Sequence, residues 1–134
     1  MYLFDTDVLS RIVKAAPPRA LVERLSGIPR ALQFTTSINV AEIVYGACRT
    51  ARRDELIRAF EGLVLPRLTV LPFDLESARV FGRLKASLEK RGLPRSEPDL
   101  RIAAIALQHG LSVVSGNVRH FEGIPGLAVE NWLE

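Results

Sequence analysis

The sequence predicts an α/β fold, a three-layer α/β/α sandwich around a mostly parallel central sheet of about five strands. Short apolar segments rich in β-branched and aromatic residues alternate with longer segments whose apolar residues recur at helical spacing. This alternation indicates crossover helices, which make neighbouring strands parallel and cover both faces of the sheet. The 134 residues are 48% hydrophobic and 25% charged, as in one globular domain. We therefore expect a single domain over residues 1–134.

The first half of the chain predicts two strands and four helices. Pro17 ends the first helix and Pro18 opens the second, which Gly27 and Pro29 bring to an end. The segment "LQFTTS" is rich in β-forming residues, and Ser37 stands where it can cap the helix that follows. The expected strands are 2–5 and 32–37, and the expected helices are 7–14, 19–26, 38–50 and 53–63.

The second half predicts three more strands and two longer helices. Asp74 caps a helix whose apolar residues share one face, and Gly110 ends another helix that begins with an acidic turn. The expected strands are 68–73, 111–116 and 127–131, the last at an edge of the sheet. The expected helices run from Asp74 to about Arg91 and over 97–110.

Polar residues follow the predicted strands at the edge where ligands bind in such sheets. The opening "MYLFDTDVLS" runs from apolar residues directly into acidic ones. In parallel α/β sheets the ligand crevice lies at the carboxyl ends of the strands, near the point where strand order reverses. The candidate residues at this edge are Asp5, Thr6, Asp7, Glu42, Glu97, Asp99, Ser115 and Asn117.

The acidic members of this set point to a hard metal ion. Carboxylates that converge on one pocket repel each other unless a cation lies between them. Oxygen ligands without a histidine or cysteine cluster favour Mg²⁺ or Mn²⁺. The only histidines, His109 and His120, lack the spacing of a metal site. No P-loop, GxGxxG or catalytic-serine motif is present.

Several of these candidates also have a purely structural alternative, such as Glu42 as an exposed helix residue. Asp5 or Asp7 can cap a helix, and Glu97 can complement the helix dipole. Asn117 can be a turn residue. The combination at one edge of the sheet favours a functional site over these separate structural roles.

Four segments, in their order and spacing, resemble the PIN domain of the VapC toxin family. They are "FDTDVLS", "AEIVYGA", "PDLRIAAIALQHGLSVVSGN" and "FEGIPGLAVENW", and together they span nearly the whole chain. The resemblance implies a Mg²⁺-dependent endoribonuclease with Mn²⁺ as a substitute and no other cofactor. It also implies the toxin half of a type II toxin–antitoxin pair, a VapB-type antitoxin in the active-site groove, a homodimer and a toxin–antitoxin hetero-oligomer.

The resemblance assigns roles to individual residues. It implies that Asp5, Glu42 and Asp99 are catalytic, with the metal on Asp5 and Asp99 and on Glu42 directly or through water. Asn117 stands where the family often has Asp, which weakens a second metal position. Asp7 matches a turn and support position. Thr6, Glu97, Ser115 and Asn117 are secondary candidates.

Charge and composition are compatible with an RNA substrate in the cytoplasm. The formal charge is +3, and 15 of the 18 basic residues are arginine, which suits phosphate contacts but also follows from a GC-rich genome. We expect tRNA, mRNA or rRNA as substrate, no membrane span, and a reducing compartment for the lone Cys48. For an antitoxin segment, residues 7–26 offer the apolar side chains Val8, Leu9, Ile12, Leu21 and Leu25.

Two alternatives remain open from the residues. "DTD" after an apolar strand also resembles the start of haloacid-dehalogenase-like phosphatases, but the downstream lysine and acidic pair of that mechanism have no counterpart at the expected places. The second alternative is a catalytically weak PIN module that binds RNA or an antitoxin, because Asn117 replaces an acid.

Overall fold

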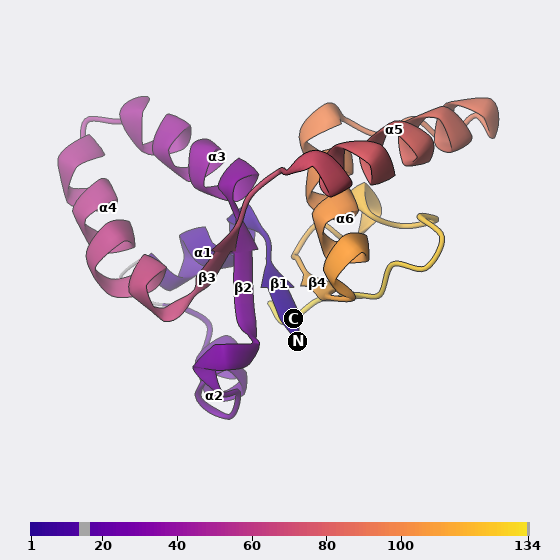
Figure 1. The fold of residues 1–134 in the computed structure, drawn as a ribbon. Helices are drawn as coiled ribbons and strands as arrows, with labels where there is room; N and C mark the ends of the chain where they lie inside the picture. Colours follow the sequence, from indigo (N-terminus) through magenta and orange to yellow (C-terminus); the bar gives the residue numbers. More distant parts are fainter. Residues whose placement is uncertain (14–16, 134) are drawn as a thin grey trace.

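The computed structural model describes residues 1–13 and 17–133 and contains a five-stranded parallel sheet. The strand order is β3-β2-β1-β4-β5, and every neighbouring pair is parallel. The predicted α/β sandwich is confirmed (Figure 1). The sheet is entirely parallel in the described residues, and β5 lies at its edge. The strands are β1 (Tyr2–Phe4), β2 (Gln33–Thr36), β3 (Thr69–Leu71), β4 (Ser112–Val114) and β5 (Val129–Glu130).

The helices lie close to their predicted places. They are α1 (Thr6–Val13), α2 (Arg19–Ser26), α3 (Ser37–Cys48), α4 (Arg53–Ala59), α5 (Leu75–Lys90) and α6 (Glu97–His109). The predicted end of the first helix at residue 14 lies outside the described residues. Helix α4 ends before the predicted residue 63 and continues as a π-helical turn (Phe60–Val64) and a 3₁₀ turn (Leu65–Arg67). None of the described helices is both long and apolar enough to cross a bilayer.

The cap of α3 differs from the prediction. Thr36, not Ser37, is the N-cap, because Thr36 has extended backbone and its hydroxyl accepts a hydrogen bond from the backbone N–H of Asn39 at 3.2 Å. Asp74 and Ser96 cap α5 and α6 in the same way. Gly110 ends α6 in the left-handed conformation, with φ of 66°.

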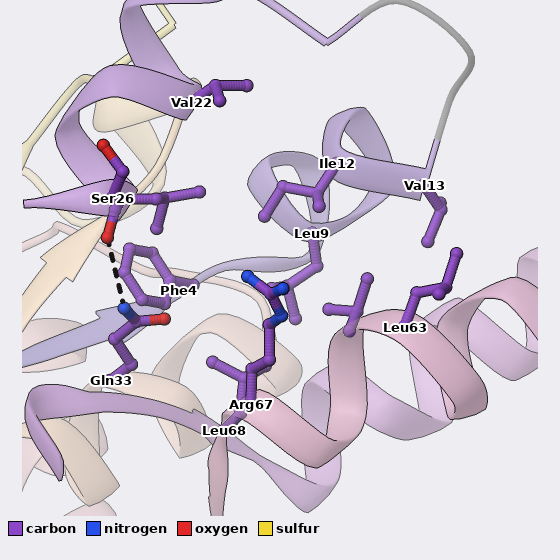
Figure 2. Close-up of a pocket in the computed structure, with 12 residues that line it drawn as sticks. Phe4, Leu9, Ile12, Val13, Val22, Ser26, Gln33, Leu63, Arg67 and Leu68 are labelled. Atoms are coloured by element: carbon purple, nitrogen blue, oxygen red, sulfur yellow. Dashed lines mark hydrogen bonds between the residues drawn. The ribbon is translucent and has the colours of Figure 1, made fainter. Parts of the chain in front are cut away.

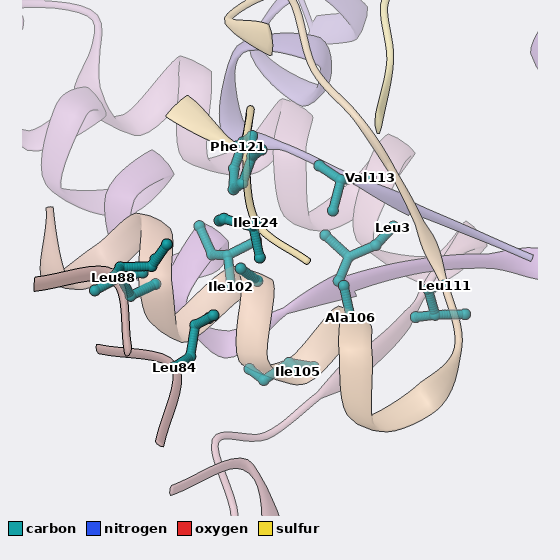
Figure 3. Packing of buried hydrophobic residues seen from close by; sticks show 12 residues of the cluster. Leu3, Leu84, Leu88, Ile102, Ile105, Ala106, Leu111, Val113, Phe121 and Ile124 are labelled. Carbon is teal, nitrogen blue, oxygen red and sulfur yellow. The ribbon is translucent and has the colours of Figure 1, made fainter. Parts of the chain in front are cut away.

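Two apolar layers cover the two faces of the sheet. Leu3 and Val113 pair across β1 and β4 and pack against α5 and α6 (Figure 3). The next pair, Phe4 and Val114, faces α1, α2 and the buried Trp132. Successive strand residues point to opposite faces, so these short strands are buried on both sides. In Figure 1, α5 and α6 lie on one side of the sheet, and α3 and α4 on the other.

The strand order reverses between β1 and β4. From β1 the chain builds outward through β2 to β3, and it then returns to place β4 and β5 on the other side of β1. The carboxyl ends of β1 and β4 therefore form the switch point where such sheets bind ligands. Asp5 and Ser115 are the first residues after these two strands.

Candidate active site

Asp5 is the buried centre of the switch point. Its side chain is 6% exposed, and its backbone N–H donates to the carbonyl of Val114 at 2.9 Å, which extends the β1–β4 ladder. Asp5 Oδ1 accepts a hydrogen bond from Asn39 Nδ2 at 3.0 Å, and Oδ2 accepts one from Ser115 Oγ at 2.8 Å. Both carboxylate oxygens are therefore oriented by neutral donors.

The negative charge of Asp5 lacks full compensation. Burial raises the pKa of Asp5 from 3.8 to about 6, and the negative charges of Asp7 and Glu42 add to this shift. Hydrogen bonds from Ser115 and from the backbone of Thr6 oppose it. The arrangement therefore disfavours the ionised carboxylate, and a bound cation would favour it.

A buried amide links Asp5 to the second acid. Asn39 is fully buried, and its Nδ2 donates to Asp5 Oδ1 and to Thr6 Oγ1, both at 3.0 Å. The Thr6 hydroxyl in turn donates to Glu42 Oε1 at 2.7 Å. Thr36 completes the network by donating to Asn39 Oδ1 at 2.6 Å. Because these donors and acceptors are linked in one chain, the network sets the positions of both carboxylates together.

Asp7 connects α1 to the loop after β4. Its Oδ2 accepts a hydrogen bond from the backbone N–H of Gly116 at 2.8 Å, and Asn117 Nδ2 lies 3.5 Å from the same oxygen. A Cβ on Gly116 would lie 2.6 Å from both Asp7 Oδ2 and Leu133 Cδ1, so only glycine allows this approach. The buried Asp7 Oδ1 has no hydrogen-bond partner among the described residues. This geometry fits the expected turn and support position.

Asp99 lies at the same edge of the sheet, in the first turn of α6, which leads back into β4. Its side chain is 16% exposed, and Oδ2 lies 3.4 Å from His120 Nδ1. No described hydrogen bond or ion pair joins Asp99 to Asp5 or Glu42. Within residues 1–13 and 17–133, no three acidic, histidine or cysteine side chains stand close enough to hold a metal ion together.

Glu97 lies in a different environment from the other acids. It pairs with Lys85 at 3.0 Å and with Arg101 at 3.2 Å on an exposed surface. These two cations lower the pKa of Glu97, the Lys85 hydrogen bond most strongly. The structure therefore places Glu97 in a surface ion-pair network and gives it no contact with the Asp5 network.

The oxygen donors at the switch point fit a hard divalent cation. Asp5, Glu42 and Asp99 offer carboxylates, and Thr6, Ser115 and Asn117 offer neutral oxygens at or near the same edge. The raised pKa of Asp5 and the unpaired Oδ1 of Asp7 mark negative potential that protein groups leave unneutralised. Oxygen donors of this type suit a hard divalent cation.

An apolar pocket of about 420 Å³ lies on one face of the sheet, between α1, α2 and the turns that follow α4. Figure 2 shows Leu9, Ile12, Val22 and Leu63 around it, with the Arg67 guanidinium as a cationic group in its wall. Of the apolar residues expected to receive an antitoxin, Leu9, Ile12 and Leu25 line the pocket.

Two of those expected groove residues belong to the core instead. Val8 and Leu21, like Leu9, are fully buried in the apolar layer of this face of the sheet, and neither Val8 nor Leu21 lines the pocket. The expectation that they offer surface to a partner is wrong, because the helical face that carries them packs on the sheet. Val22 and Leu63, which sequence reasoning did not single out, are 47% and 70% exposed and take their place.

Two polar residues near the acids were also missed from the sequence. Asn39 bridges Asp5 and Thr6, and His120 contacts Asp99. The available signal for Asn39 was its place three residues before Glu42, which puts both on one helical face. His120 follows Asn117 at the exit of β4, but its spacing from His109 drew attention only to metal-binding motifs.

Comparison with known proteins identifies the family. The profile of the family described as "PIN domain" matches residues 2–127. The chain is 36% identical to Ribonuclease VapC2 of Haemophilus influenzae over 132 residues, which cover 98% of each protein. The chain belongs to the VapC ribonucleases of the PIN domain family. The proposed resemblance is thereby confirmed, and the alternative of a haloacid-dehalogenase-like phosphatase is wrong.

Other VapC relatives agree over the full length. The tRNA(fMet)-specific endonuclease VapC of Salmonella typhimurium is 32% identical and covers 98% of this chain and 97% of its own. Among solved structures, DNA-bound VapBC from the same organism has a TM-score of 0.89 at 32% identity, covering 98% of this chain and 97% of the matched one. VapBC2 from Rickettsia felis, bound to a promoter DNA fragment, has a TM-score of 0.89 at 26% identity and covers 98% of both chains.

Proposed function

We propose that this VapC ribonuclease is a divalent-metal-dependent endoribonuclease, with Mg²⁺ as its ion and Mn²⁺ as a substitute, and that residues 1–134 form one PIN domain. The observation that carries the metal proposal is the buried carboxylate of Asp5, whose pKa is raised to about 6 beside Asp7 and Glu42. A buried acid of this kind is stabilised in its ionised form by a cation. The all-oxygen surroundings select a hard one.

Asp5, Glu42 and Asp99 are the proposed ligands and catalytic groups. When bound, the cation would neutralise charge at the scissile phosphate and acidify the attacking water. Asp5 holds its orientation through Asn39 and Ser115. Glu42 has Oε1 engaged by Thr6, and its second oxygen orients the attacking water and accepts its proton. Asp99 lies in the first turn of α6, and His120 Nδ1 is 3.4 Å from its Oδ2.

The secondary candidates divide into three groups. Thr6 and Ser115 hydrogen-bond to Glu42 and Asp5, so they position the acids. Asn117 is exposed at the rim, where its neutral amide can reach a phosphate oxygen but adds no charge for a second metal. Glu97 acts in the surface ion-pair network and takes no part in the chemistry.

The partner that we propose is a VapB-type antitoxin seated on the apolar pocket, in a toxin–antitoxin hetero-oligomer whose toxin is a homodimer. The structural neighbours are VapBC complexes, which supports this assembly. An uninhibited ribonuclease would attack the RNA of its own cell, so we place the protein in the cytoplasm with its inhibitor. The name of the Salmonella relative makes initiator tRNA the first RNA to test.

Cleavage assays with matched variants test this function. Purified protein is incubated with initiator tRNA and with a mixed RNA pool, in Mg²⁺ and in EDTA. We expect internal cleavage in Mg²⁺, none in EDTA, and a loss of at least about a hundredfold in Asp5→Asn and Asp99→Asn. Glu97→Gln serves as the control and keeps wild-type rates. Cleavage in EDTA, or full activity in both folded aspartate variants, would overturn the assignment.

A further inference from the structure

The helix that carries Glu42 also carries an unusual exposed patch. Tyr45 is 64% exposed, and it is the only exposed aromatic side chain among the described residues. The guanidinium of Arg49 lies 5.5 Å from the centre of the Tyr45 ring. No carboxylate among the described residues lies within ion-pair distance of Arg49. The pair therefore presents a π-face and a free positive charge to solvent.

The patch lies on the active-site face of α3. Tyr45 and Arg49 follow Glu42 by three and seven residues, so all three side chains share one side of the helix. Glu42 is directed at the switch point by its bond from Thr6. The patch thus starts one helical turn, roughly 5 Å along the axis, beyond the acid.

A glycine opens space in the same face. Gly46 stands four residues after Glu42 and beside Tyr45, and a Cβ built there meets no atom within 4 Å. Glycine inside a helix is less favourable than alanine, and here the surrounding structure gives no steric reason for it. The gap left by Gly46 lets a flat ligand approach the helix backbone next to the tyrosine ring.

The charge beyond the patch is suited to a polyanion. Residues 49–58, at the turn between α3 and α4, contain four arginines and two acids, and a shallow depression lies over this turn. Arg52 and Arg53 pair with the neighbouring acids, whereas Arg49 and Arg58 have no ion pair within the described part of the chain, and Arg49 is the one that lies against Tyr45. A phosphate backbone that leaves the acidic centre along α3 meets positive charge here.

We propose that Tyr45, Gly46 and Arg49 form a nucleotide subsite that binds the RNA substrate next to the scissile phosphate. A nucleobase stacks on the Tyr45 ring above Gly46, and Arg49 binds the following phosphate. Stacking of this kind is tolerant of base identity because every base has a π-face. The subsite rests on the proposed ribonuclease function and adds a substrate-binding element to it.

Binding measured apart from cleavage tests the subsite. The probe is a fluorescein-labelled single-stranded RNA of ten adenylates, titrated with full-length protein in EDTA and followed by anisotropy. We expect Tyr45→Ala to weaken binding at least about fivefold, Tyr45→Phe to retain it, and Arg49→Gln to weaken it with a smaller salt dependence. Equal losses in Tyr45→Ala and Tyr45→Phe would overturn stacking, as would no loss in either.

Glycine variants supply a control that separates stability from binding. We expect Gly46→Ala to raise Tm by roughly 2–5 °C and still to weaken RNA binding, because the methyl group fills the gap. Gly82→Ala, at an equally open helical site in α5, raises Tm without changing RNA binding. Unchanged binding in Gly46→Ala would contradict the subsite.

Two further measurements complete the test. Sedimentation distinguishes the subsite from an interface between copies of the chain, and cleavage distinguishes a failure of the subsite from a failure of the ribonuclease function. If sedimentation shows that Tyr45→Ala dissociates an oligomer, and RNA binding falls only with that dissociation, the patch is such an interface and the subsite is wrong. If wild-type protein cleaves RNA while all these variants bind normally, the subsite fails and the ribonuclease function stands. If wild-type protein neither binds nor cleaves RNA, both fail.

Discussion

Asp5 carries the main electrostatic cost of the candidate site. Its carboxylate is buried, and the nearest hydrogen-bond donors are the neutral groups of Asn39 and Ser115. These bonds orient the carboxylate but leave its pKa raised to about 6. The buried charge of Asp5 therefore lowers the stability of the folded protein. A bound cation can restore that stability, as at many functional sites.

The first prediction concerns stability against pH in EDTA. The folded state binds the Asp5 proton more tightly than the unfolded state, so the ionised side chain costs stability at neutral pH, up to about 3 kcal/mol for a pKa of about 6 in place of 3.8. This cost disappears as pH falls from about 6 toward 4. We therefore expect Asp5→Asn to be about 1–3 kcal/mol more stable than wild type at pH 7.5 and to lose this advantage near pH 4.

Urea unfolding at both pH values measures this difference, with Glu97→Gln as a surface control. Mg²⁺ should then stabilise wild type and leave Asp5→Asn unchanged. A variant that is less stable than wild type at pH 7.5 would show that hydrogen bonding, rather than charge, dominates at Asp5.

At the scale of elements, local signals predict helices better than they predict their connections. The sequence predicts α2 to the residue, because Pro18 and Gly27 bound it. It misplaces the cap of α3, because Thr36 and Ser37 are adjacent and equally suited, and the choice depends on the buried contact with Asn39. It overextends α4, because the π-helical turn that follows buries Phe60 and Val64 in the core.

The same limit applies to the site. Asp5 and Ser115 are predictable because both follow strands that flank the switch point. The Asn39 bridge is not, because it depends on how α3 packs beside β1. The position of Asp99 against His120 likewise depends on the path of the loop after β4.

The second prediction concerns the connection between α1 and the β4 loop. Gly116→Ala would place a methyl group 2.6 Å from both Asp7 Oδ2 and Leu133 Cδ1, so the loop must shift and the Asp7 hydrogen bond to its backbone must lengthen. We expect a loss of about 1–3 kcal/mol in unfolding free energy. Gly82→Ala, which meets no atom within 4 Å, should be neutral or stabilising. Equal Tm values for Gly116→Ala and wild type would show that the loop shifts without a loss of stability.

At the scale of the whole molecule, the acidic residues and the apolar pocket occupy different parts of the sheet. The acids lie at the carboxyl edge, while the apolar pocket lies on the face covered by α1 and α2. Phe4 and Leu9, near Asp5 in the chain, line one part of the pocket, and Gln33 and Leu68, at the amino ends of β2 and β3, line another. A partner that fills the pocket must therefore extend past Phe4 and Leu9 to cover the acids as well.

The third prediction tests this coupling with the cognate antitoxin. Val22 and Leu63 line the pocket and are exposed, so glutamate at both positions leaves the core intact and places charge against an apolar partner segment. We expect the double variant Val22→Glu, Leu63→Glu to fold, to cleave RNA at the wild-type rate, and to bind antitoxin at least about a hundredfold more weakly. Leu75→Glu is the matched control, because Leu75 is 66% exposed on α5, away from the pocket.

Calorimetry measures the affinity, and inhibition of cleavage gives the functional readout. Full inhibition of the double variant by stoichiometric antitoxin would place the antitoxin on another surface.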